Sequence, residues 1–169
     1  MTLEESKTKF IDTWGGLGSA WGISKSMAQM HAFLLTSPEA MSMEDIMEEL
    51  NMSRGNVNLN VRSLVDWGLV ERISVKGERK EFFRAEKDIW RIATKIAGER
   101  RKRELEPVVN TLMQVKDIDP ADRKKKEAQQ FIQFIESLED FVRKVDGALE
   151  LFVKADSNWF AGTLLKLIK

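Results

Sequence analysis

Cysteine and tyrosine are absent from the 169 residues, and His31 is the single histidine. The lack of thiols excludes disulfides, thiolate nucleophiles, iron–sulfur clusters and cysteine-ligated zinc. One histidine also excludes any metal site that needs two histidines from one chain. We therefore expect no bound metal and no cofactor.

Long apolar runs are missing as well. No run approaches the roughly 20 residues that span a bilayer, and the acidic residues 1–5 lack the apolar stretch of a secretory signal. The 27 basic and 27 acidic residues cancel, while 43% hydrophobic residues suffice for a packed core. We expect a cytoplasmic protein that has no membrane partner.

The charges are unevenly distributed along the chain. Residues 38–50 carry five acids and no base, whereas residues 51–87 carry eight bases against five acids. Residues 91–103 carry six bases against Glu99 alone. A partner that touches one face responds to local charge, so a net charge of zero does not exclude nucleic acid.

The first part of the chain is predicted to hold two helices. Apolar spacing predicts a helix over residues 3–14, and the glycines between residues 15 and 22 predict a break and a loop. Ser24 is then a suitable N-cap for a helix through Thr36. We interpret residues 1–37 as N-terminal helices that support the fold and contribute to a dimer.

The spacing of apolar residues changes in the middle of the chain. Caps and apolar spacing predict helices over residues 42–50 and 53–67, and alternation then predicts strands over residues 69–75 and 80–84. Helix, tight turn, helix and β-hairpin are the order of a winged helix-turn-helix. The expected fold is thus mainly α with a small β-hairpin wing, and residues 38–87 form its DNA-binding domain.

The last part, residues 88–169, is predicted to be a helical dimerisation region. Pro107 should kink a helix or start a new one, and Asp119-Pro120 predicts a clean restart. From Ala128 to Phe152, apolar residues alternate at spacings of three and four, which is typical of a coiled-coil or helix-bundle seam. The tail, residues 159–168, is again amphipathic.

Helix 53–67 has the features of a DNA-recognition helix. Its period buries Val57 and Val61, so the opposite side presents polar residues and Leu59, which would suit a thymine methyl or be an isolated surface leucine. The helix start offers free N–H groups to a phosphate, and the hairpin tip adds cations that would grip the backbone. The candidate DNA-binding residues are Ser53, Arg54, Gly55, Asn56, Asn58, Leu59, Arg62, Lys76, Arg79 and Lys80.

Residues 41–90, which begin MSMEDIMEELNMSRGNVNLNV, resemble the winged-helix transcription regulators of the GbsR/MarR type. The resemblance implies a homodimer that reads a pseudo-palindromic operator in double-stranded DNA with recognition helix 53–67 and wing 74–82. It further implies repression of transcription and release by a small-molecule effector.

Two questions stay open at this stage. Phe10, Trp14 and Trp21 could form an aromatic cage for an effector, because cation–π attraction suits quaternary ammonium ligands, but core packing also explains them. The few bases in helix 53–67 also fit an alternative, a winged-helix protein–protein interaction module without sequence-specific DNA binding. The sequence holds no P-loop, nucleophile elbow or two-metal carboxylate set, so we do not expect an enzyme.

Overall fold

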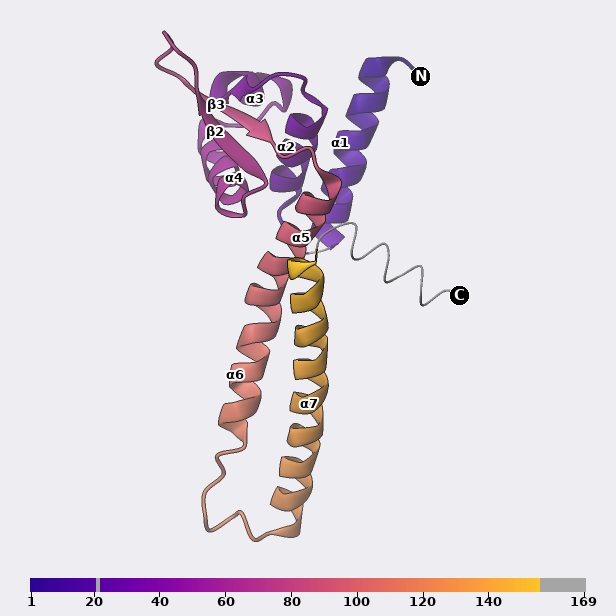
Figure 1. Cartoon of the computed structure of the whole chain (residues 1–169), viewed down its shortest axis with the longest axis vertical. Helices are drawn as coiled ribbons and strands as arrows, with labels where there is room; N and C mark the ends of the chain where they lie inside the picture. Colours follow the sequence, from indigo (N-terminus) through magenta and orange to yellow (C-terminus); the bar gives the residue numbers. More distant parts are fainter. Residues whose placement is uncertain (21, 156–169) are drawn as a thin grey trace. The chain divides into compact units, whose positions relative to one another are not determined.

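The computed structural model describes residues 1–20 and 22–155 (Figure 1). It divides the chain into two compact units, Met1–Ile92 and a second that begins at Ala93. The chain is mainly helical, with a three-stranded antiparallel sheet in the first unit, which confirms the predicted fold class.

The elements of the first unit, in chain order, are α1 (Leu3–Ala20), α2 (Lys25–Thr36), β1 (Met41–Ser42), α3 (Met43–Glu49), α4 (Arg54–Asp66), β2 (Val70–Ser74) and β3 (Glu81–Ala85). Helix α5 (Ile89–Arg100) begins in this unit and continues into the second. There it is followed by the π-helix η1 (Arg101–Leu105), α6 (Glu106–Val115) and α7 (Lys126–Lys154). Among the described residues, no helix combines the length and the apolar character that crossing a bilayer requires.

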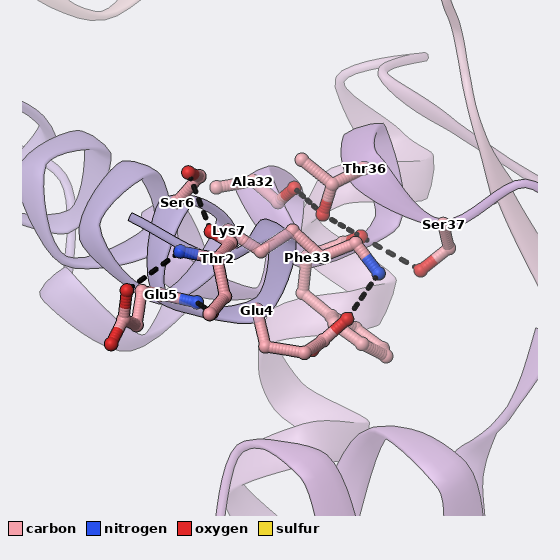
Figure 2. A network of polar contacts seen from close by, with 9 residues as sticks. All are labelled: Thr2, Glu4, Glu5, Ser6, Lys7, Ala32, Phe33, Thr36 and Ser37. Atoms are coloured by element: carbon pink, nitrogen blue, oxygen red, sulfur yellow. Dashed lines mark hydrogen bonds and ion pairs between the residues drawn. The ribbon is translucent and has the colours of Figure 1, made fainter.

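Side-chain caps explain where the helices of the first unit begin. The hydroxyls of Ser24 and Ser53 accept hydrogen bonds from the first turns of α2 and α4, and Ser42 forms a capping box with Asp45. Figure 2 shows the same arrangement at α1, where the Glu5 carboxylate accepts from the Thr2 backbone N–H at 2.7 Å. These local signals account for the agreement between the predicted and observed helix starts.

The sheet has the strand order β1-β3-β2. Phe83 on the central strand pairs with Arg72 on one side and with Met41 on the other, and its side chain is buried in the core. The hairpin of β2 and β3 was predicted, whereas the two-residue strand β1 was not. The largest fully buried side chains of this unit come from four helices and strands: Met30, Leu34, Ile46, Val57, Val61, Leu64 and Phe83.

The predicted loop over the first glycines is wrong, because α1 continues through them to Ala20. Gly15 and Gly18 are buried against α2. A Cβ placed on Gly18 would lie 2.4 Å from Ala28 Cβ, and one on Gly15 would lie 2.6 Å from Gln29 Cγ. The glycines therefore let two helices approach closely, and this packing outweighs their poor helix propensity of about 1 kcal/mol each.

Helices α6 and α7 lie side by side in the second unit (Figure 1). Their core is formed by Leu112, Ile135 and Val142, against which Val109 and Leu138 pack. The predicted heptad seam of α7 is thus used partly within its own chain. The tail over residues 159–168 lies outside the described residues.

The predicted helix restart at Pro120 is wrong. Residues 119–125 form turns, in which the Asp119 carboxylate accepts a hydrogen bond from the Ala121 N–H, and α7 begins only at Lys126. The N–H groups of Asp122 and Lys125 donate to carbonyls three residues back, so the segment closes tight turns in place of a continuous i→i−4 ladder. Pro107, by contrast, lies at the start of α6, as a proline that begins a new helix should.

Candidate nucleic-acid interface

Helix α4 has one buried and one exposed side. Val57, Val61 and Leu64 are buried, as the apolar period predicted. The opposite side exposes Arg62 and Leu59, and 69% of the Leu59 surface is accessible. A helix with an accessible outer side of this kind can enter the major groove of DNA.

The first turn of α4 is open to solvent. Ser53, Arg54 and Gly55 are all exposed, and the Ser53 hydroxyl accepts a hydrogen bond from the Asn56 backbone N–H at 3.3 Å. A Cβ placed on Gly55 would meet no atom within 4 Å. Packing within the described chain therefore does not require a glycine at this position.

Asn56, which was also a candidate for DNA reading, is half-buried and turned toward α2. Its Nδ2 donates to the Ser26 hydroxyl at 3.4 Å, and its backbone carbonyl accepts from Asn60 Nδ2 at 2.8 Å. The Ser24 hydroxyl in turn donates to Asn60 Oδ1 at 2.9 Å. This polar network joins α4 to α2. Sequence reasoning missed Asn60. It could have been found as a polar residue at a position that the helical period assigns to the buried side of the helix.

Asn58 is half-buried on α4. On the wing, the strand cations are paired across the hairpin, with Arg72 Nη1 at 2.9 Å from Glu81 and Arg84 Nη2 at 2.7 Å from Glu71. Lys76 and Arg79, beside the left-handed Gly77 at the tip, are exposed and have no ion pair among the described residues. The tip therefore carries cations that an external anion can reach.

Glu44, a residue that sequence reasoning did not select, lies beside two of the candidate residues. One carboxylate oxygen accepts a hydrogen bond from Arg54 Nη2 at 2.9 Å, and the other lies 3.7 Å from Lys80 Nζ. The sequence could have indicated this pairing, because the acidic segment 38–50 lies directly before the basic segment 51–87. A single acid thus pairs with one cation of α4 and one of the wing.

The base of the wing is fixed by Lys87. Its ammonium group donates to the backbone carbonyls of Leu34, Leu35 and Ser37 at the C-terminal end of α2. Partial burial lowers the pKa of Lys87, but the three acceptors satisfy the donors of its charged form. The Ser37 hydroxyl donates to Phe33 O at the same helix end (Figure 2).

Two of the candidate effector residues, Phe10 and Trp14, belong to an aromatic cluster between α1 and α2. The ring centroids of Phe10 and Trp14 are 5.5 Å apart, and those of Trp14 and His31 are 6.3 Å apart. His31 is 3% exposed, its Nε2 has no partner among the described residues, and burial lowers its pKa to about 4. Trp21 lies outside the described residues.

Comparisons with known proteins agree with this geometry. The sequence model of the MarR family matches residues 28–81. The transcriptional regulator MmpR5 of Mycobacterium tuberculosis is 28% identical over 103 residues, which cover 60% of this chain but only 59% of that protein. The transcriptional repressor GbsR of Bacillus subtilis is 25% identical over 157 residues, or 92% of this chain and 79% of the repressor.

A solved structure supports the fold. The crystal structure of a transcriptional regulator has a TM-score of 0.58 and 21% identity, covering 88% of this chain and 95% of the other. Regulators of the MarR family bind DNA and are not enzymes. The chain therefore has a winged helix-turn-helix fold, its residues 28–81 match the MarR family, and it is similar over most of its length to a repressor of the GbsR type.

Proposed function

We propose that this chain is a homodimeric regulator that represses transcription by binding operator DNA in the cytoplasm. Helix α4 enters the major groove, and the wing over residues 74–82 lies along the DNA backbone. The observation that carries the proposal is the exposed outer side of α4, with Arg62 and Leu59, next to a wing whose tip holds the accessible cations Lys76 and Arg79.

The surroundings of Leu59 favour DNA over a protein partner. The other large exposed apolar side chains of the described first unit lie elsewhere, in residues 1–17, at Val75 on the wing and at Ile89. Leu59 is thus an isolated apolar residue among polar neighbours, whereas a docking surface for a protein is a continuous apolar patch. A thymine methyl group fits a single exposed leucine.

The second unit supplies a surface that a second copy would cover. Phe134 and Phe141 on α7 are each 63% exposed and lie seven residues apart, and Leu151 is 64% exposed. A repeat of seven on an exposed helix side is typical of packing against another helix. A dimer presents two copies of α4, so the operator should be pseudo-palindromic, with half-sites about 10 bp or a small multiple apart.

An effector belongs to the proposal as well. Phe10, Trp14 and Trp21 remain the candidates for binding a small molecule that releases the DNA, and the tilted ring contact between Phe10 and Trp14 supports such a role for the first two.

Fluorescence anisotropy with a labelled duplex from upstream of the protein's own gene tests DNA binding. We expect the affinity to fall steeply with salt, and Arg62→Ala to reduce the slope of log affinity against log salt by about one. Arg123→Ala, which removes an exposed cation from the loop before α7, should leave the slope unchanged. Binding that is absent, or that does not respond to salt, contradicts the proposal.

The dimer has a separate test. Analytical ultracentrifugation of the wild type should give twice the 19.4 kDa mass of one chain. Phe141→Glu should shift the protein toward the monomer, because the carboxylate would be buried at the interface. A monomeric wild type would refute this part of the proposal.

A protein–protein interaction module is the second candidate function. The specific observation in its favour is the modest charge of α4, whose bases are Arg54 and Arg62, the first of them already paired with Glu44. A folded wild-type dimer that fails to bind any duplex at low salt would support this alternative.

A further inference from the structure

Glu44 connects the two elements that are proposed to hold DNA. It lies in the first turn of α3, where the capping box of Ser42 and Asp45 fixes the helix start. Its carboxylate contacts Arg54, the first residue of α4, and Lys80, which directly precedes β3 in the wing. One acid therefore bridges the recognition helix and the wing.

A carboxylate and a phosphate are alternative partners for the same cations. Both accept charge-assisted hydrogen bonds from a guanidinium or an ammonium group. The side chains of Arg54, Lys80 and Glu44 are 68%, 56% and 46% exposed, so a phosphate can reach the two cations without any unfolding. Exposed ion pairs of this kind contribute little to stability, which makes an exchange of partners feasible.

The neighbouring acid, Asp45, forms its hydrogen bonds with Ser42, unlike Glu44. The backbone N–H of Ser42 donates to its carboxylate at 2.7 Å, and the hydrogen bonds with Ser42 are the main cause of its lowered pKa. Asp45 is therefore committed to the helix start. The remaining candidate cations, Arg62, Lys76 and Arg79, have no ion pair within the described ranges.

We propose that Glu44 acts as an internal substitute for a DNA phosphate. It holds Arg54 and Lys80 in the free protein, competes with the backbone phosphates for both, and so limits the affinity for DNA. This inference rests on the proposed DNA-binding function and assigns that function a residue that sets its strength.

The competition has a consequence for specificity. Binding to random DNA depends on phosphate contacts alone, whereas an operator also offers base contacts to the outer side of α4. An acid that weakens the phosphate contacts lowers both affinities by a similar factor, because specificity is the difference between the two binding free energies. Glu44 therefore limits affinity and leaves discrimination to the base contacts of α4.

The test compares Glu44→Gln with the wild type and with Glu49→Gln, all as full-length chains. Glu49 is exposed on the same helix and has no ion pair among the described residues, so its change alters net charge equally. Anisotropy is measured with a random-sequence duplex and with the upstream duplex over a range of salt concentrations. Thermal unfolding of each variant verifies that the fold is retained.

We expect Glu44→Gln to bind the random duplex roughly threefold to tenfold more tightly at low salt, with a salt slope steeper by about 0.9. Glu49→Gln should stay within about twofold of the wild type, since the field of a distant exposed charge is screened. In an Arg54→Ala background, the gain from Glu44→Gln should shrink, because one of the two released cations is missing.

Several results would overturn the inference. Weaker binding by Glu44→Gln would mean that Glu44 positions Arg54 for DNA, and equal gains from the two glutamine variants would mean that net charge alone matters. If Glu44→Gln equals a wild type that binds in a salt-dependent manner, the inference fails while the proposed function stands. If neither protein binds any duplex, both fail.

Discussion

The buried His31 makes the stability of this protein depend on pH in a predictable direction. The unfolded chain takes up a proton near the ordinary pKa of 6.5, whereas burial lowers the pKa of the folded form to about 4. Between these values the unfolded state binds more protons, so the free energy of unfolding decreases as the pH falls from about 6.5 toward 4 and levels off below.

The magnitude follows from the two pKa values. At about pH 5.5, one unit below the unfolded pKa, protonation favours the unfolded chain by a factor of about ten while the folded histidine stays neutral. That factor corresponds to about 1.4 kcal/mol. The carboxylates with lowered pKa values, such as Asp45 and Asp146, change charge at lower pH and contribute little in this range.

Urea denaturation at about pH 7.5 and about pH 5.5, at one fixed protein concentration, measures the effect. We expect the wild type to lose about 1.4 kcal/mol between the two conditions and His31→Leu, which cannot be protonated, to lose less than about 0.5 kcal/mol. His31→Gln serves as a second neutral variant if leucine disturbs the contact with Trp14. An equal loss in wild type and variants, or no loss in any of them, would refute the argument.

Two further predictions concern packing and helix ends. Gly18→Ala should destabilise the protein by about 1–3 kcal/mol, because the new Cβ would lie 2.4 Å from Ala28 Cβ. Gly16→Ala, with no atom within 4 Å, should instead stabilise it by about 0.5–1 kcal/mol in the same urea titration; the same sign for both would be inconsistent with the glycine contact. Lys87→Met should cost about 1–3 kcal/mol by leaving the carbonyls at the end of α2 without their charged donor. Lys76→Met at the wing tip should not move the urea midpoint, and an equally small effect at Lys87 would mean that water replaces its ammonium group.

The parts of the fold that were predicted depend on local signals. Ser24, Ser42 and Ser53 cap helices through residues three positions away, and the left-handed Gly68 marks the end of α4. The strand β1 could not be predicted, since two residues carry no period and their pairing with Phe83 joins distant parts of the chain. The glycines of α1 were misread for the same reason, because their packing against α2 is invisible to local rules.

The candidate site divides in the same way. The exposed position of Leu59 follows from the helical period that buries Val57 and Val61. The inward turn of Asn56 and the pairing of Glu44 with Arg54 depend on where α2 and α3 lie in space, which no spacing in the sequence determines.

The network of hydroxyl and amide groups between α2 and α4 also fixes the orientation of α4. Apolar surfaces alone tolerate small slips, since one methyl group can replace another. A slip of α4 along α2 would separate Ser24 from Asn60 and leave buried polar atoms without partners. The helix is consequently held in a single position, so under the proposed function a base-reading side chain would keep the same reach on every duplex that the protein binds.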